Sequence, residues 1–338
     1  MSSLSQSPRV PSAAASSRRW RDKALLIGLI ALVLAGLAGL AIATGWEETL
    51  AGLNSLTFAQ ICVLLALSLC NYGLRGLRWH LFAGRLGLPT PLISNLRHFL
   101  GGFAMSVTPG RVGELVRMRW IHRETGWAFD KTAPLVLIDR AADLSAMAIL
   151  LAVALALSAT GIAGGAPVAI LALLAAYVAT RPQLVRGVAD LGHRLTAKRL
   201  PRLFARIRRA AKSLQAFHGP GLLMLAGALG VIGWLAEAYA FHLLLAWMDA
   251  GIGLWLAMAI FVFATLAGGL TGAPGGLGGA EAAMVGLLAI NGVALEIAIP
   301  TTLIIRLTTL WFAIGIGLLV FPIAERVSQK TANDLENN

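Results

Sequence analysis

Two short segments of the chain carry the same order of residue types: proline, glycine, any residue, an apolar residue and glycine, with a glutamate close behind. Residues 109–113 are followed by Glu114, and residues 274–278 are followed by Glu281. Each segment interrupts a hydrophobic run long enough to enter a membrane. Non-helical backbone persists at membrane depth only where protein or a water-filled cavity surrounds it. Paired interruptions in two halves of a membrane protein are typical of a transport site.

The first break combines a helix stop with a helix start. Its candidate site residues are Pro109, Gly110, Arg111, Gly113, Glu114 and Arg117. A half-helix that begins near Gly113 would present free N–H groups, which suit anions, and Arg111 would add donors matched to phosphate or carboxylate. Glu114 and Arg117 lie three apart and can pair, which leaves Arg111 for a ligand. The alternative is a cytoplasmic loop whose charges contact headgroups or each other.

A second candidate set lies at the start of another apolar segment. Asp139, Arg140 and Asp143 are spaced so that the two aspartates share a helical face. Charged residues in a spanning segment normally face the protein interior and have partners, and Arg111 or Arg117 could be that partner. Alternatively, all three lie at the cytoplasmic interface and mainly fix the topology.

The second break is unusually rich in glycine, with seven glycines between positions 268 and 279. Its candidate site residues are Pro274, Gly275, Gly276, Gly278 and Glu281. Such a segment is a poor helix former and fits a tight re-entrant tip or a close approach to a ligand. The alternative is close packing of helices through small residues.

Arg306 lies in the middle of an apolar run and therefore needs an anionic partner. Glu281 is the first candidate and Glu237 the second. Such a pair is either a substrate-binding element or a purely structural intramembrane ion pair.

Composition sets the elements that must position these residues. The 338-residue chain is 57% hydrophobic and 13% charged, with a mean hydropathy of +0.76, which excludes a soluble globular protein. The net charge of +12 is concentrated in loops, and we interpret it as topology and attraction to anionic headgroups, not nucleic-acid binding. Histidine spacing indicates no metal site, and no nucleotide or hydrolase motif predicts a cofactor or catalytic residues.

We therefore predict an all-α polytopic membrane protein with about six full transmembrane helices and two re-entrant hairpins in an inverted-repeat arrangement. The spans are expected at residues 24–43, 58–74, 134–157, 167–180, 220–247 and 300–321. A basic cytoplasmic tail (1–23) precedes a single membrane domain (24–325) and a polar C-terminal tail (326–338). The two halves of the domain, about 24–180 and 220–325, are joined by a basic amphipathic cytoplasmic segment, 181–218.

The hairpins are expected to insert from opposite faces. Basic flanks on both sides of residues 92–107 and the first break place that hairpin on the cytoplasmic side. The flanks are Arg75, Arg78 and Arg85 before it and Arg117, Arg119, Arg123 and Lys131 after it. The second hairpin, residues 254–290, would insert from outside, because its preceding loop lacks lysine and arginine. In the alternative, both arms of 254–290 span the membrane fully, and loop charge does not separate the two options.

At these three motifs the chain resembles the lysylphosphatidylglycerol synthase transmembrane-region family, whose stand-alone members are also called flippase-like membrane proteins. The resemblance covers about residues 20–325. It implies a multi-helix inner-membrane domain with re-entrant elements, related to the part of the synthases thought to move lipid between leaflets. Stand-alone relatives are associated with polyprenyl-linked glycans or hopanoid metabolism. Because the chain ends at Asn338 without the soluble aminoacyl-transferring domain, that enzymatic activity is not expected.

The leading functional hypothesis is a lipid flippase of the inner membrane, with both termini cytoplasmic and an anionic or amphiphilic lipid as substrate. Membrane lipids are the expected partners, and enzymes of lipid or envelope biosynthesis are further candidates. One alternative is a non-transporting scaffold for such enzymes. The other is a membrane-embedded lipid-modifying enzyme that uses Glu114 or Asp139 as acid or base.

Overall fold

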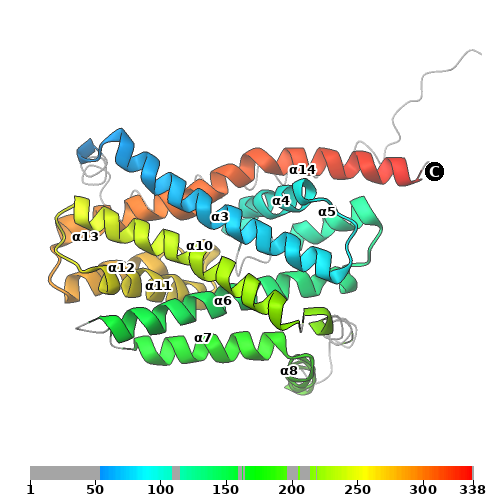
Figure 1. Cartoon of the computed structure of the whole chain (residues 1–338), viewed down its shortest axis with the longest axis horizontal. Helices are drawn as coiled ribbons and strands as arrows, with labels where there is room; N and C mark the ends of the chain where they lie inside the picture. The colour runs from blue at the N-terminus through cyan, green and yellow to red at the C-terminus, as the bar shows by residue number, and fades with distance from the viewer. Residues whose placement is uncertain are drawn as a thin grey trace, which may run out of the picture. The chain divides into compact units, whose positions relative to one another are not determined.

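A computed structural model describes residues 54–108, 115–158, 162, 164–195, 205, 214–217 and 219–336. All regular secondary structure in these ranges is helical (Figure 1), which confirms the predicted all-α polytopic membrane fold. The α-helices are α3 (Phe58–Leu86), α4 (Leu92–Gly101), α5 (Val116–Thr125), α6 (Phe129–Leu157), α7 (Gly165–Thr180), α8 (Pro182–Leu195), α10 (Pro220–Trp247), α11 (Leu254–Leu270), α12 (Gly279–Ile290), α13 (Leu295–Arg306) and α14 (Phe312–Glu336). Shorter helical turns are η1 (Gly102–Val107), η3 (Leu214–Phe217), η4 (Pro274–Gly276) and the π-helical η5 (Leu307–Trp311).

Four helical stretches within the described ranges are long and apolar enough to cross a membrane. They are α3, α6, α10 and the continuous stretch Leu295–Asp334, which joins α13, η5 and most of α14. The bent pair α7–α8 gives a fifth candidate. The predicted span at 24–43 and the tail at 1–23 lie outside the described residues, so the number of six crossings stays a prediction.

Helix α3 is longer than the sequence suggested. Thr57 and Gln60 form a reciprocal capping box at its start. The helix then continues past the expected end at Leu74, through Arg75 and Arg78, until Gly87 ends it in a left-handed conformation, with φ of 82°. The basic stretch that we expected to be a cytoplasmic flank is therefore partly inside the helix bundle.

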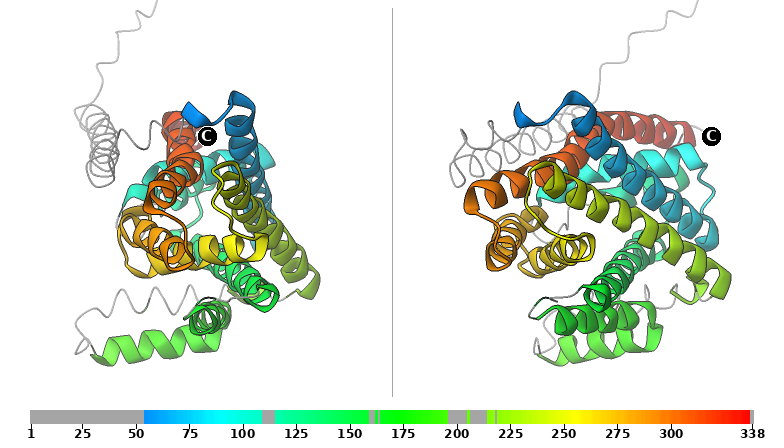
Figure 2. Two further views of the ribbon diagram at one scale, coloured as in Figure 1. Left: turned by 90° about the vertical axis from the view of Figure 1, so that its left-hand side faces the viewer. Right: turned by 60° about the vertical axis from the view of Figure 1, so that its left-hand side comes forward.

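Helices α7 and α8 meet at a bend of 98°. Leu184, Val188 and Leu191 on α8 are exposed at helical spacing, while Arg186 and Arg194 belong to the same helix. Figure 2 shows α8 running crosswise to α7. If α7 crosses the membrane, a helix at this angle would run along the bilayer surface, where an amphipathic pattern is stable. Helix α8 is the described start of the predicted amphipathic segment 181–218.

The structure has a helix on either side of each break, and the re-entrant insertion of the two hairpins stays a prediction. Helices α4 and α5 flank the first break and lie toward the end where α3 finishes (Figure 1). Helices α11 and α12 flank η4 and lie toward the end where α3 begins (Figure 1). This placement is what insertion from opposite faces would produce. The inverted repeat itself stays a prediction.

The turn η1, which precedes the first break, contacts η4 of the second break. Helix α3 packs on α10, α4 and α6, while α14 packs on η1, α4 and α5. One glycine allows the close approach of α14, because a Cβ on Gly317 would lie 2.2 Å from the backbone nitrogen of Ala104. The packing thus brings parts of both halves to one central region.

Candidate functional site

The largest set of buried charges joins α3 to α6 and is called here the arginine–aspartate network: Arg75, Arg78, Asp139 and Asp143. Arg75 donates from Nε and Nη2 to the two carboxylate oxygens of Asp143, at 3.0 and 2.6 Å. Arg78 Nη2 donates to Oδ1 of Asp139 at 2.6 Å and to Oδ1 of Asp143 at 2.7 Å. All four side chains are buried. Charge-assisted bidentate bonds of this kind fix the relative position of the two helices.

Further groups enclose the network. Trp234 Nε1 on α10 donates to Asp143 at 3.2 Å. The Arg117 guanidinium on α5 lies 4.7 Å from the ring centre of Phe99 and 5.1 Å from that of Trp79, with Nη1 3.9 Å from Asp139 Oδ2. Burial lowers the pKa of Arg117 to about 10, which leaves it protonated at neutral pH. Cation–π contacts replace part of the hydration that this charge has lost.

The structure confirms one predicted partner of the two aspartates, at a longer distance, and adds two closer ones. We expected Arg111 or Arg117; Arg111 lies outside the described residues, and Arg117 is the more distant contact. The close partners are Arg75 and Arg78, which the sequence analysis had assigned to a cytoplasmic flank. Their three-residue spacing on one helix, facing aspartates four apart on another, was the signal that could have found them. The third predicted residue, Arg140, lies 3.8 Å from Asp143 and is partly exposed.

The predicted pair of Arg306 and Glu281 is confirmed. Arg306 Nε donates to Glu281 Oε1 at 2.5 Å, and both side chains are buried. Arg306 Nη2 also donates to the carbonyl oxygen of Gly275 in the second break, at 2.8 Å. This one arginine therefore ties α13 both to α12 and to the break itself.

The glycines of the second break have a clear conformational role. Gly275, Gly276 and Gly278 have φ of 61°, 72° and 80°, in the left-handed region that other residues rarely adopt. The turn begins at Pro274, the first residue of η4. These conformations turn the Gly275 carbonyl toward Arg306, so the predicted Pro-Gly motif shapes the backbone around the ion pair.

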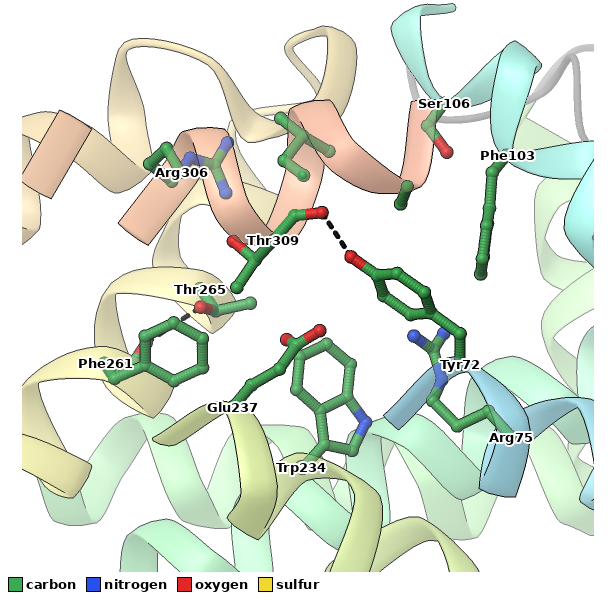
Figure 3. Close-up of a pocket in the computed structure, with 12 residues that line it drawn as sticks. Tyr72, Arg75, Phe103, Ser106, Trp234, Glu237, Phe261, Thr265, Arg306 and Thr309 are labelled. Carbon is green, nitrogen blue, oxygen red and sulfur yellow. Dashed lines mark hydrogen bonds between the residues drawn. The ribbon is translucent and has the colours of Figure 1, made fainter. Parts of the chain in front are cut away.

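A cavity of about 50 Å³, called here the central cavity, lies between the network and the Arg306–Glu281 pair (Figure 3). Its lining comprises Tyr72, Arg75, Phe103, Ser106, Trp234, Glu237, Phe261, Thr265, Arg306, Thr309, Leu310 and Ala313. The first half of the chain supplies α3 and η1, and the second half supplies α10, α11, α13, η5 and α14. A polar cavity of this volume has room for a few water molecules.

Two residues of this cavity stand out among those that the predicted site did not include. Glu237 in α10 is 5% exposed and extends into the space between Tyr72 and Thr265 (Figure 3). The Tyr72 hydroxyl donates to the carbonyl oxygen of Thr309 at 2.5 Å, inside the π-helical turn. Glu237 had been named only as a second possible partner of Arg306.

Part of the predicted site cannot be placed. Pro109, Gly110, Arg111, Gly113 and Glu114 all lie outside the described residues. The chain on the near side of that break is described as far as Thr108, and Ser106 lines the central cavity. The roles of the residues of the first break stay predictions.

A model of one protein family, described as "Lysylphosphatidylglycerol synthase TM region", matches residues 25–317 of this chain. The chain belongs to that family. A search of curated proteins found no match. The predicted resemblance is thereby confirmed, and the chain is a membrane protein from a lipid-related family. The match spans the network, both sides of each break and the central cavity.

In this TM-region protein a further ionic cluster lies where α5 packs on α14. Arg119 donates to Glu325 at 2.5 Å, Trp120 Nε1 donates to it at 2.8 Å, and Arg123 also pairs with it. Beside it, Glu124 accepts from Arg97 at 2.8 Å. The Glu325 contacts anchor the first hairpin to the last helix, and the Arg97–Glu124 pair joins the two helices of that hairpin.

The charge on Glu124 is stabilised by its neighbours. Burial acts to raise the pKa of Glu124, but the hydrogen bond and charge of His98, together with Arg97, outweigh burial and bring the pKa below its usual value. His98 Nε2 lies 3.1 Å from the carboxylate. This part of the TM-region protein therefore depends on an ionised glutamate.

The chemistry available in the centre is recognition of polar or anionic groups. Among the described residues no group of three or more histidine, cysteine, aspartate and glutamate side chains could hold a metal ion. What the cavity offers is hydroxyl groups, two arginines and one glutamate, enclosed by membrane helices. Such groups can replace the hydration of a headgroup at membrane depth.

Proposed function

We propose that this protein is a flippase-like lipid transporter of the inner membrane, which moves an anionic or amphiphilic lipid between leaflets. The observation that supports this most is the central cavity, a polar space among membrane helices with walls from both halves of the chain. In transporters built from two repeats, substrate sites lie at the interface of the repeats, near the bilayer midplane.

The lining suits a phosphate-bearing headgroup. Arg75 and Arg306 lie on different walls, and Ser106, Thr265 and Thr309 add hydroxyl groups (Figure 3). A headgroup that crosses hydrocarbon alone loses its hydrogen bonds to water, at several kcal/mol for each group. The cavity would replace those bonds while the tail stays in lipid.

The tail has a candidate place of its own. An apolar groove of about 590 Å³ lies between α6, α7 and α10. Its lining is mostly aliphatic or aromatic: Phe82, Ile138, Ala141, Ala142, Ser145, Ile149, Ile170, Leu173, Leu174, Ala176, Tyr177, Thr180, Leu223, Ala226 and Gly227. Ile138 and Ala141 flank the network residue Asp139 on α6. A lipid with its tail in this groove would have its headgroup beside the buried arginines and Arg140.

The central cavity as it stands holds water-sized groups, so its walls must separate for a headgroup to pass. One wall contains irregular backbone, the π-helical turn of η5. The left-handed glycines of the second break lie next to another wall, because the Gly275 carbonyl accepts a hydrogen bond from Arg306. Hinges that absorb changes in φ and ψ are concentrated at such positions. We therefore place the opening motion at the second hairpin and η5, with α3 and α6 as the fixed part.

Leaflet exchange of fluorescent phosphatidylglycerol and phosphatidylcholine in proteoliposomes tests this function. The parent protein should accelerate exchange of the anionic lipid, and Arg306→Gln should abolish most of that acceleration. Arg326→Gln is the matched control, because Arg326 is exposed near the end of α14. Equal rates for the parent, Arg306→Gln and protein-free vesicles would contradict transport.

The same samples separate the other two hypotheses. A lipid-modifying enzyme would yield a chemically altered lipid, which mass spectrometry of the recovered lipids would detect. A scaffold would yield unaltered lipid and no accelerated exchange. Its function would then depend on the basic residues at 199, 202, 206 and 209, which lie outside the described residues. Anionic membrane lipids are the proposed partners, with enzymes of envelope biosynthesis as secondary ones.

A further inference from the structure

Glu237 lies buried inside a membrane helix, where the charged form of a carboxylate is energetically costly. It lies seventeen residues after Pro220 and ten before Trp247, the two ends of α10. At a rise of 1.5 Å per residue, it is therefore about 15 Å from the nearer helix end. Its side chain is 5% exposed and lines the central cavity. Ionisable residues at such depth are functional candidates, because burial without function is costly.

Among the buried side chains around the cavity, the charges balance only if Glu237 is ionised; Arg140, which also contacts Asp143, is partly exposed to solvent and is not counted. Four buried cations lie in the network, beside it or in the lining of the cavity: Arg75, Arg78, Arg117 and Arg306. The buried anions in the same region are Asp139, Asp143, Glu237 and Glu281. Four positive charges therefore face four negative charges. If Glu237 binds a proton, the region carries one net positive charge, which matches a singly charged phosphodiester headgroup.

The other groups that face Glu237 are not suited to take up this proton. From α3 these are Tyr72, whose hydroxyl already donates to Thr309 in η5, and Arg75, which is bonded to Asp143. Arg306 from α13 is bonded to Glu281 on α12. Arginine keeps its charge at any relevant pH. The remaining neighbours do not titrate near neutral pH: Trp234 on α10, Ser106 in η1 and Thr265 on α11.

An anion in this cavity acts on Glu237 in one direction. A second negative charge within a few ångströms disfavours the carboxylate and favours its protonated form. By reciprocity, a proton on Glu237 strengthens binding of the anion by the same factor. The effect is larger where less water screens the two charges, and the accessible volume of this partly open cavity is about 50 Å³.

We propose that Glu237 is a proton-binding site coupled to the lipid headgroup, so that one anionic phosphate headgroup enters the central cavity together with one proton. The neutral pair would cross the membrane more easily than the headgroup alone, and a proton gradient would drive the exchange. This inference rests on the proposed transport function and adds its co-transported ion. The proton moves from water to the carboxylate and returns to water when the headgroup leaves.

The direct test is proton uptake on lipid binding to the purified protein in a nonionic detergent. Dihexanoyl phosphatidylglycerol is titrated into weakly buffered protein at pH 7 with a pH-sensitive dye. The parent should take up about one proton for each lipid bound. Glu237→Gln should bind the lipid with no proton uptake, while Glu237→Asp should retain uptake. Glu296→Gln, at an exposed position on α13, is the control and should behave as the parent.

Lipid binding by the parent without proton uptake would overturn the proposal, and so would equal uptake by Glu237→Gln. Absence of binding in the parent would overturn it as well. Near-identical melting temperatures of parent and variants establish that the substitutions leave the fold intact.

Vesicle exchange under an imposed pH gradient separates this inference from the transport function. The parent should exchange labelled phosphatidylglycerol faster down the proton gradient, and Glu237→Gln should be indifferent to it. Exchange by the parent that ignores pH, or that follows sodium instead, would contradict proton coupling and leave transport intact. Proton uptake on binding without any exchange would contradict transport and leave the coupled site intact.

Discussion

The two buried sets of ion pairs are built differently. In the arginine–aspartate network, each aspartate is held by more than one donor, and both arginines reach Asp143 across two regular helices. Arg306 and Glu281 form a single bridge that depends on a glycine-rich break. Within the described part of the chain, each set has a buried atom without a hydrogen-bond partner: Oε2 of Glu281 and Nη1 of Arg78. One set is over-determined and the other is held by few bonds.

This difference suggests that one set of ion pairs holds the framework fixed and the other permits movement. Networks in which every group has several partners fix one arrangement, because no single bond can break without exposing a buried charge. A bridge with one strong contact and an adaptable backbone can exist in two arrangements at a smaller energy difference. We therefore assign the network to the framework and the Arg306–Glu281 pair to the part that moves.

The largest expected effect comes from breaking the framework. Asp143→Asn removes the charge that Arg75 and Arg78 share, and it should lower the free energy of unfolding by about 3–5 kcal/mol, since two buried cations lose a partner. Thermal unfolding of the detergent-solubilised protein measures this. Asp249→Asn, at an exposed loop position, should leave the melting temperature unchanged. Equal melting curves for both variants would remove the distinction between the two sets.

Breaking the mobile pair should affect transport more than stability. Glu281→Gln should lower the free energy of unfolding by about 1.5–3 kcal/mol, the range for a hydrogen bond to a charged group, and it should abolish lipid exchange. The double variant Glu281→Leu with Arg306→Met should unfold close to the parent, because apolar replacement of a buried pair is often neutral. Should that double variant also exchange lipid at the parent rate, the pair would have no part in the path.

A packing change sharpens the comparison at the first break. Gly317→Ala would drive a Cβ into the backbone of Ala104 and should destabilise the protein by about 1–3 kcal/mol. Gly315→Ala, two residues earlier on α14, has open space around the added Cβ and should have little effect. Comparison of their denaturation midpoints gives the result. Similar midpoints would mean that α14 can shift away from η1 without loss.

The smallest effect concerns Glu124, which joins the two helices of the first hairpin. Because the pKa of Glu124 lies below its usual value, ionised Glu124 stabilises the folded protein above the unfolded pKa, and this stability is lost as the pH falls through the folded value. The melting temperature should therefore decrease as the pH drops below about 4. Near pH 7, Glu124→Gln should melt at a lower temperature than the parent. At acidic pH its melting temperature should change less with pH than that of the parent, whereas Asp334→Asn should follow the parent. An unchanged acid limb in Glu124→Gln would show that this carboxylate does not carry the effect.

Sequence patterns predicted the second half of the site better than the first. Arg306 stands alone in an apolar run, so its need for an anionic partner was evident. Glu281, directly behind the second break, was the first candidate for that partner. The first half was harder, because Arg75 and Arg78 follow an apolar run of ordinary length and resemble a positive cytoplasmic flank. Their burial depends on Asp139 and Asp143, which lie more than sixty positions away.

For Glu237, the sequence pattern did not predict the surroundings of the side chain. A single glutamate in an apolar helix predicts a polar partner but does not show which other helices surround it. Its place in the central cavity results from the packing of α10 on α3 and α11. Helix composition predicted the all-α membrane fold, whereas the length of α3 depended on tertiary contacts that no local pattern contains.

The π-helical turn at Leu307–Trp311 sets the angle between the two faces with which the last long helical stretch contacts the two hairpins. An α-helix advances by about 100° per residue, and a π turn accommodates one extra residue. Side chains after η5 are therefore rotated by about one residue step relative to those before it. Arg306, before the turn, meets Glu281 of the second hairpin, whereas Gly317, after it, packs on η1 of the first. The angular offset between the two hairpin contacts is set by one inserted residue, so loss of a single residue in this turn would rotate one contact surface away from its partner.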